Sequence, residues 1–256
     1  IGGQARFFFE PQNLQSLQEA LIFARQARIR IFVLGAGSNI LVSDSGLDGL
    51  VIKLSGKFFK EIQIKGSCAV AASGLKLNQL VLLARDKGLS GLEFLAGIPG
   101  TLGGALMGNA GAWGKSIGEL VREVCVLDYQ GRLKLLKGKR LKFTYRKSNL
   151  DSYIIIWAKL KLFPRAKNAI TASIKQYLAQ RSKSQDNSKP CAGCIFKNPG
   201  WDSAGRLLDL CGLKGRIKGG AVISQRHANF ILNATKAKSR DVLFLMNLMR
   251  KKVMAK

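Results

Sequence analysis

The sequence predicts a mixed α+β fold, on three observations. Segments with helical and with strand-like apolar spacing follow one another in an irregular order without an internal repeat. Hydrophobic residues make up 47% of the 256 positions, which is enough for a sizeable core and argues against disorder. After Pro164 the pattern shifts towards helices, so we expect a domain boundary near that residue. No run reaches the roughly 18 apolar residues of a membrane span.

The first part of the chain predicts alternating helices and strands. Asn13 can cap a helix over 14–27, in which Leu17, Leu21 and Ala24 recur at helical spacing. A second helix begins near Leu77 and ends at Gly88. Strands are expected, with a turn at Gln130-Gly131, over Ile31–Leu34, Leu50–Leu54, Lys57–Ile64, Ser67–Ala72, Leu120–Tyr129, Arg132–Leu136 and Tyr153–Leu160.

The rest of the sequence predicts three helices, with a polar segment between the first and the second. Pro164 is expected to break the preceding strand pattern. Helices are expected over 169–182, 203–211 and 239–254. The stretch from Ser182 to Pro190 is polar and is expected to be an exposed loop.

The charge balance points to anionic partners. Lys and Arg number 42 against 15 acidic residues, which gives a net charge of +27. Such a field attracts nucleic acid, membrane surfaces or phosphorylated substrates. The basic residues are spread along the chain without aromatic interleaving or finger spacing, so we expect a mostly solvated surface, a specific anion site and no nucleic-acid partner.

Five cysteines at irregular spacing indicate reduced thiols and a cytoplasmic protein. Cys191 and Cys194 form a CxxC pair, but a zinc site would need two more ligands from Cys68, Cys125, Cys211 or the single His227. No βαβ pattern surrounds the pair. We therefore expect neither a metal nor a redox role.

Two glycine-rich segments are candidate ligand loops. The first directly follows a strand and reads Gly35, Ala36, Gly37, Ser38, Asn39, Ile40 and Leu41. It could form an anion nest or a plain tight turn, but it is neither a Rossmann fingerprint nor a P-loop. The second, 91–114, holds eight glycines in 24 positions and favours backbone brought against a large flat or phosphorylated ligand over a simple loop. There Thr101 could start a helical turn beside a phosphate, and Leu95 and Ile98 could pack a ring.

Two later segments carry polar chemistry. Arg146 lies at a strand end, where it could bind a carboxylate or phosphate or form a surface ion pair. The turn from Pro190 to Pro199 presents the thiol of Cys194, the cation of Lys197 and the amide of Asn198. An isolated histidine such as His227 is more often structural than catalytic.

Taken in order, these segments resemble the UDP-N-acetylenolpyruvoylglucosamine reductases, the MurB family. The resemblance rests on Gly2-Gly3 and on 35–43, 91–114, 145–148, 193–199 and 221–233. It implies a vanillyl-alcohol-oxidase-type fold, with FAD-binding subdomains at 1–55 and 56–164 and a UDP-sugar domain at 165–256. Few residues separate Leu160 from Cys191, which resembles the short form that lacks a tyrosine loop.

The resemblance also implies an activity in bacterial peptidoglycan synthesis. NADPH would reduce FAD, and UDP-N-acetylglucosamine enolpyruvate would be reduced to UDP-N-acetylmuramate in the cytoplasm by a monomer. The FAD would be non-covalent, because the single histidine is His227, outside the first half. Arg146 would stabilise the enolate-like charge, and Cys194 would protonate it where the family more often has Ser.

The remaining implied residues are binding residues. Substrate would contact Tyr145, Lys197 and Asn198. The cofactor would contact Gly35, Ala36, Gly37, Ser38, Asn39, Ile40, Leu41, Gly97, Ile98, Pro99, Gly100, Thr101, Gly103, Gly104, Asn109, Gly111 and Ala112.

The family's catalytic Glu follows its last helix, and no acid here matches its position, so a missing C-terminal tail is expected, with a shortened start. Three alternatives stay open. They are a catalytically impaired flavin-binding homologue, another FAD oxidoreductase of this fold, and a nucleic-acid-binding module driven by the charge.

Overall fold

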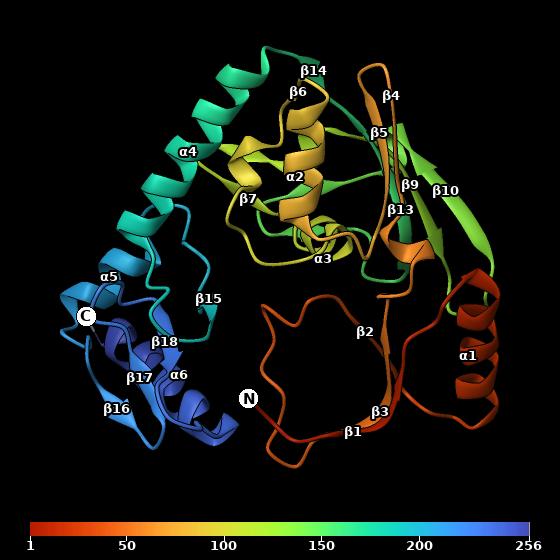
Figure 1. Ribbon diagram of the computed structural model, residues 1–256. Helices are drawn as coiled ribbons and strands as arrows, with labels where there is room; N and C mark the ends of the chain where they lie inside the picture. Colours follow the sequence, from red (N-terminus) through yellow and green to blue (C-terminus); the bar gives the residue numbers. More distant parts are fainter. Residues whose placement is uncertain (256) are drawn as a thin grey trace. The chain divides into compact units, whose positions relative to one another are not determined.

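The computed structural model describes residues 1–255 and divides into two compact units (Figure 1). The larger unit comprises Phe7–Gly37 and Asp48–Ala179. The smaller unit comprises Ile1–Arg6, Ser38–Leu47 and the chain from Gln180 onward. Helices and strands alternate irregularly in both, so the predicted α+β class is confirmed.

The larger unit begins with a three-stranded sheet and a capped helix. The sheet has the order β1 (Ala5–Phe9), β3 (Leu47–Lys53) and β2 (Ile31–Leu34), with β2 parallel to β3. Helix α1 (Leu14–Gln26) begins where Asn13 Oδ1 accepts a hydrogen bond from the Ser16 N–H at 2.9 Å. This confirms the predicted helix and its cap. Strand β2 is confirmed too, whereas β3 begins three residues earlier than expected.

A five-stranded antiparallel sheet forms the centre of this unit. Its order is β10 (Leu133–Lys137), β9 (Val121–Leu127), β13 (Ile154–Lys161), β5 (Cys68–Ala72) and β4 (Ile62–Lys65). On one face Val124 and Val126 join a core with α2 and α3, which Figure 1 shows on that side. On the other face Cys125 and Leu127 pack with α1. The central strands β9 and β13 are therefore largely buried, whereas the edge strand β4 alternates between apolar and polar residues.

The expected strand over Lys57–Ile64 is only partly correct. Residues Phe58–Lys60 form a 3₁₀ turn, and the strand begins at Ile62. The turn is stabilised because Phe59 is fully buried against α1 and its N–H donates to the Gly56 carbonyl.

Short helices and strand pairs complete the larger unit. Helix α2 (Leu77–Asp86) ends before Gly88, whose φ is +66°, and α3 (Leu102–Met107) begins at Thr101. Both starts and the Gly88 stop agree with expectation. The strand pairs are β6 (Leu89–Ser90) with β14 (Phe163–Pro164), β7 (Gly111–Ala112) with β8 (Lys115–Ser116), and β11 (Phe143–Thr144) with β12 (Lys147–Ser148).

The strand pattern ends at Pro164 as expected, although Pro164 itself still pairs with Leu89 in a two-residue strand. Helix α4 (Lys167–Ser184) follows it directly. Its early residues Ile170 and Ile174 belong to the larger core.

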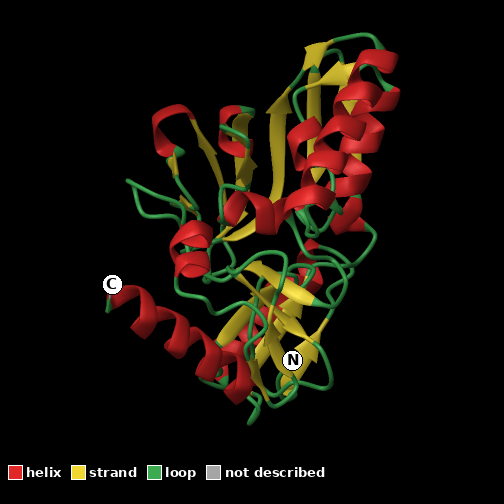
Figure 2. Ribbon diagram, turned by 90° about the vertical axis from the view of Figure 1, so that its left-hand side faces the viewer, coloured by secondary structure: helices red, strands yellow, loops and turns green. Residues whose placement is uncertain are grey.

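The smaller unit contains a sheet that the sequence pattern did not predict. Strands β15 (Cys191–Cys194), β18 (Phe230–Asn233), β17 (Ala221–Ile223) and β16 (Ile217–Lys218) pair antiparallel in that order. Helix α5 (Ala204–Leu210) and helix α6 (Ser239–Met254) match the predicted helices. Helix α6, which ends at the C label in Figure 2, packs on the sheet through Val242, Leu245 and Met249.

The expectation of an exposed loop from Ser182 to Pro190 is wrong in two respects. Helix α4 continues to Ser184, and Asp186 is buried. The Asp186 carboxylate accepts hydrogen bonds from Ser188 and from Ser224 Oγ at 2.6 Å, which hold its pKa below the ordinary range. Separately, no helix within residues 1–255 has the length and apolar character needed to cross a membrane.

Candidate active site

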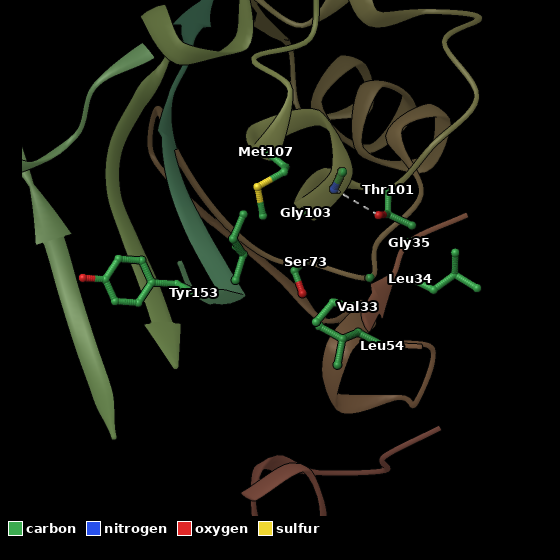
Figure 3. Close-up of a pocket in the computed structure, with 12 residues that line it drawn as sticks. Val33, Leu34, Gly35, Leu54, Ser73, Thr101, Gly103, Met107 and Tyr153 are labelled. Carbon is green, nitrogen blue, oxygen red and sulfur yellow. Dashed lines mark hydrogen bonds between the residues drawn. The ribbon is translucent and has the colours of Figure 1, made fainter. Parts of the chain in front are cut away.

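A cleft in the larger unit lies where β2, β5 and α3 converge (Figure 3). About 490 Å³ of unfilled space lies in it, part of which is open solvent. Its lining residues are Val33, Leu34, Gly35, Leu54, Ser73, Gly74, Thr101, Gly103, Gly104, Met107, Tyr153 and Ile155.

Four of the predicted cofactor residues line this cleft: Gly35, Thr101, Gly103 and Gly104. The glycines allow close approach of chain segments. A Cβ on Gly35 would lie 2.9 Å from Thr101 Oγ1, and one on Gly103 would lie 3.0 Å from Ser73 Cβ. Glycine density in the sequence therefore reflects protein packing at the cleft as well as room for a ligand.

Ser73 supplies the cleft with a polar group that lacks a protein partner. Its side chain is 2% exposed, and its Oγ makes no hydrogen bond with any of the residues 1–255. Its main chain is fully used, since the N–H donates to Ile156 O at 2.8 Å and the carbonyl accepts from Gly103 N at 2.7 Å. An unsatisfied buried hydroxyl is destabilising by about 1–3 kcal/mol, so a polar ligand atom beside Ser73 would be favourable. The cleft thus fits a cofactor that presents both an apolar surface and polar edges.

The start of α3 offers less to an anion than the sequence suggested. The N–H groups of Leu102 and Gly103 already donate to the carbonyls of Leu75 and Ser73. The N–H of Gly104 lies 3.4 Å from Thr101 Oγ1. What this turn can give a ligand is mainly the Thr101 hydroxyl. Leu95 is fully buried in the core, so the expectation that it packs a ligand ring is wrong.

The other expected cofactor residues lie in three segments. Ala36 and Gly37 follow β2 in the larger unit, whereas Ser38, Asn39, Ile40 and Leu41 belong to the smaller unit, where Leu41 packs on its core. The segment before α3 contains Gly97 (φ +77°), Ile98, Pro99 and Gly100 (φ +159°). Strand β7 consists of Gly111 and Ala112.

Asn109 holds two separate segments of the larger unit together. It is 7% exposed, with a φ of +42°. Its Nδ2 donates to Thr144 O at 2.9 Å, and its Oδ1 accepts from Gly118 N at 3.0 Å. The predicted cofactor role of Asn109 stays a prediction, but the structure gives its amide this structural role.

The hairpin of β11 and β12 carries Tyr145 and Arg146 at its tip. Thr144 pairs with Lys147, so these two residues form the turn, and Arg146 has a φ of +55°. That conformation is unfavourable for a non-glycine residue and needs support. Asn109 bonds one strand, and Ser148 Oγ bonds the other to Met107 O at 2.9 Å. The Arg146 guanidinium carbon lies 5.7 Å from the centre of the Tyr145 ring, which is 57% exposed.

In the smaller unit Cys194, Lys197 and Asn198 lie on one stretch of chain beside β18. Asn229 fixes it, because its carbonyl accepts from Ile195 N while its side chain bonds both the N–H and the carbonyl of Phe196, each at 2.9 Å. Asn198 Oδ1 accepts from Ala204 N at 3.0 Å and so helps to start α5. The Cys194 side chain is exposed.

His227 has a structural environment. Its Nδ1 accepts a hydrogen bond from Asn229 N at 3.1 Å, and its ring packs against Phe230. Burial lowers its pKa, which favours the neutral ring. The structural interpretation of His227 is therefore supported. Within residues 1–255 no three His, Cys, Asp or Glu side chains are grouped to hold a metal ion.

Sequence reasoning missed Ser73, Tyr153 and Asn229. A usable signal existed for Ser73, because Ser73-Gly74 follows strand β5 as Gly35 follows β2. No local signal distinguishes Asn229, whose three bonds reach residues more than 30 positions away.

Comparison with known proteins identifies the two halves of the chain. A family model described as "FAD binding domain" matches residues 5–136, and one for the reductase's C-terminal domain matches 184–256. The UDP-N-acetylenolpyruvoylglucosamine reductase of Desulforamulus reducens is 40% identical over 255 residues, covering 99% of this chain and 84% of the relative. The crystal structure of the Thermus caldophilus reductase has a TM-score of 0.85 at 36% identity, covering 95% of this chain and 87% of that one.

The fold extends further than the family. A grass pollen protein with glucose dehydrogenase activity has a TM-score of 0.52 at 21% identity, covering 64% of this chain and 36% of that one, which is a likeness of fold alone. The expected vanillyl-alcohol-oxidase-type FAD-binding fold is confirmed. With its FAD-binding part, its reductase C-terminal part and this identity along nearly its whole length, the chain belongs to the UDP-N-acetylenolpyruvoylglucosamine reductase family, the MurB family.

Proposed function

We propose that this chain catalyses the NADPH-dependent, FAD-mediated reduction of UDP-N-acetylglucosamine enolpyruvate to UDP-N-acetylmuramate in peptidoglycan precursor synthesis. The observation that carries the proposal is the presence, on one chain, of the FAD-binding model and the reductase C-terminal model. The chemistry of the side chains described above supports it.

The cleft around Ser73 is the proposed FAD site in the larger unit. The Ser73 hydroxyl would bond a polar atom of the cofactor, and Thr101 would offer a second hydroxyl. Gly35, Gly103 and Gly104 add no side chain to the lining of the cleft, so the cofactor can approach their backbone closely. The further FAD contacts that we propose are Ala36, Gly37, Ser38, Asn39, Ile40, Leu41, Gly97, Ile98, Pro99, Gly100, Gly111 and Ala112. Bound FAD supplies hydride chemistry, accepting hydride from NADPH and delivering it to the enolpyruvyl double bond.

Arg146 is proposed to stabilise the negative charge that develops beside the substrate carboxylate. Adding hydride to one carbon of the double bond leaves enolate-like charge on the other carbon and on the carboxylate. A guanidinium pairs with a carboxylate through two parallel hydrogen bonds. The hairpin holds Arg146 in an unfavourable backbone conformation, which is typical of side chains placed for function.

Cys194 is proposed to donate the proton that completes the reduction. Its thiol is exposed on the edge strand β15, where a substrate can reach it. A thiol is a better acid than a serine hydroxyl, so it can donate this proton.

Lys197, Asn198 and Tyr145 are proposed substrate-binding residues. Lys197 offers a cation for the diphosphate, and the fixed turn beside Asn229 sets its direction. Tyr145 offers an exposed ring at the hairpin tip. We also place the protein in the bacterial cytoplasm, because its five irregularly spaced cysteines do not suggest a disulfide framework and the proposed reaction uses NADPH.

The test uses anaerobic half-reactions of the purified full-length holoenzyme. Acid precipitation should release all the flavin, as expected of non-covalent FAD. In the first step NADPH should reduce the flavin and bleach its spectrum. In the second step UDP-N-acetylglucosamine enolpyruvate should reoxidise the flavin and restore the spectrum. Cys194→Ala should keep the first step and slow the second by roughly 10²–10⁴-fold, while Cys194→Ser keeps much of it. Arg146→Ala should slow the second step by roughly 10²–10³-fold with flavin content unchanged. A reduced flavin that the UDP-sugar does not reoxidise would reject the proposed reaction.

A further inference from the structure

Strand β15 contains an irregularity that changes how its two cysteines are placed. Cys191 pairs with Leu232 and Cys194 pairs with Phe230, so three steps along β15 match two steps along β18. The extra residue forms a bulge, in which Gly193 has a φ of +76°. In a regular strand, residues three apart point to opposite faces and lie about 10 Å apart.

The bulge brings this pair within disulfide range. Leu232 and Phe230 are two residues apart, so their Cα atoms are separated by about 6.6 Å and their side chains share a face. Their partners Cys191 and Cys194 inherit that spacing and that face. Disulfides join Cα atoms about 4.4–6.8 Å apart. This Cα spacing is at the upper end of that range, so closing the bond requires a local shift of β15 that brings the two Cβ atoms to about 3.5–4.5 Å.

The pair is also accessible and lies on an adaptable edge. Cys194 is exposed and Cys191 half-buried, and both are thiols. Strand β15 is the edge of its sheet, so a small shift there disturbs one neighbouring strand. Cys125 provides a contrast within the same chain, since it is buried in the larger unit and burial raises its pKa.

We propose that Cys191 and Cys194 form a redox modification site, at which hydrogen peroxide converts the two thiols into an intramolecular disulfide. The Cys194 sulfur attacks the peroxide and becomes a sulfenic acid, with release of one water. The Cys191 sulfur then attacks that sulfur and a second water leaves, forming the S–S bond. Two thiols are oxidised by two electrons, and one hydrogen peroxide is reduced to two waters.

In the disulfide Cys194 has no thiol proton to donate to the substrate. The effect on turnover rests on the proposed function, in which Cys194 is the proton donor. Oxidation would stop the reoxidation of reduced flavin by the UDP-sugar and leave reduction by NADPH intact. Cys191 would also protect Cys194, because a resolved disulfide is reversible whereas a sulfinic acid is not. Cys191 thus protects Cys194 from irreversible oxidation, although the reduced enzyme does not need Cys191 for turnover.

The test treats the reduced holoenzyme with hydrogen peroxide, removes the peroxide, alkylates the denatured protein at neutral pH and maps the peptides. The expected result is a disulfide between Cys191 and Cys194, with alkylatable thiols falling from five to three. Flavin reoxidation by the UDP-sugar should fall at least tenfold and return with dithiothreitol.

Cys191→Ser is the matched variant, since it keeps Cys194 and should turn over normally when reduced. Under peroxide it should form no disulfide, and its loss of activity should resist dithiothreitol as Cys194 becomes a sulfinic acid. The proposal is overturned if wild-type Cys191 remains alkylatable after Cys194 has been oxidised. Because peptide mapping does not depend on turnover, a disulfide without loss of activity would reject the donor role of Cys194 and leave the modification site standing.

Discussion

Asn109 offers a direct way to separate positioning of Arg146 from cofactor binding. Its side chain bonds Thr144 O at 2.9 Å in the hairpin that carries Arg146, and Gly118 N at 3.0 Å in the next loop. It does so from a left-handed backbone conformation that Asn tolerates better than most residues. We expect Asn109→Ala to loosen the hairpin without emptying the FAD cleft, which Asn109 does not line.

The loss of stability expected for Asn109→Ala has two parts, the lost hydrogen bonds and the backbone strain. Losing two hydrogen bonds to a buried side chain lowers the free energy of unfolding by about 1–3 kcal/mol. Alanine at positive φ adds about 1 kcal/mol. A total of about 3 kcal/mol should lower the melting temperature by roughly 6–12 °C for a chain of this size. If the hairpin tip moves by about 1 Å, the step that uses Arg146 should slow by up to about 10²-fold.

Three further variants sharpen the interpretation. Asn109→Asp keeps the acceptor for Gly118 and the tolerance of positive φ but sets a carboxylate oxygen against Thr144 O, so it should lower stability and slow turnover. Ser148→Ala removes the other tie, to Met107 O, and should be non-additive with Asn109→Asp because both act on one hairpin. Asn13→Ala removes the α1 cap and should lower stability by about 1 kcal/mol without any change in turnover.

The assay combines thermal melting, flavin content and the two anaerobic half-reactions. The expected pattern is full flavin content, normal reduction by NADPH and slow reoxidation by the UDP-sugar. The positioning argument fails if the Asn109 variants melt lower but reoxidise at the wild-type rate. Flavin loss in proportion to activity would instead place Asn109 in the cofactor site.

Three other results are expected. Ser73→Ala should raise the apoprotein's melting temperature by a few degrees, because it removes a buried hydroxyl that has no partner within residues 1–255. It should also raise the FAD dissociation constant about 5–20-fold in a flavin titration, and a drop in apoprotein melting temperature would contradict this. Lys197→Met should raise the KM for the UDP-sugar and leave flavin reduction by NADPH unchanged, and equal damage to flavin loading would make the residue structural. The pKa of Asp128 is depressed by the hydrogen bond from the Arg132 N–H, and then by the side chains of Lys134 and Arg132. The ionised carboxylate therefore stabilises the fold above the unfolded pKa of about 4, and this stabilisation is lost as the pH falls below that value. In Asp128→Asn the urea midpoint should depend less on pH below about pH 4 than in the wild type, and an equal dependence in both proteins would refute the assignment.

The sequence alone determined those features whose causes are local. Helix α1 follows from Asn13 and the spacing of its apolar residues, and α2 ends at Gly88 because that residue adopts a positive φ. The order of the glycine segments and the turn at 193–199 pointed to the family that the comparisons establish. Such signals lie within a few neighbouring residues, so they can be recognised before the chain is folded.

The tertiary structure decided what depends on residues distant in the sequence. Strands β15 to β18 have two to four residues each, too few for a period to be visible, and they form because β18 supplies partners more than 30 residues from β15. Ser73 became a cofactor candidate only when β2 and α3 enclosed its hydroxyl. Asn109 reaches 35 residues along the chain to Thr144. Hydrogen bonding and burial between distant segments leave no local trace in composition or spacing, and for that reason these assignments required the folded chain.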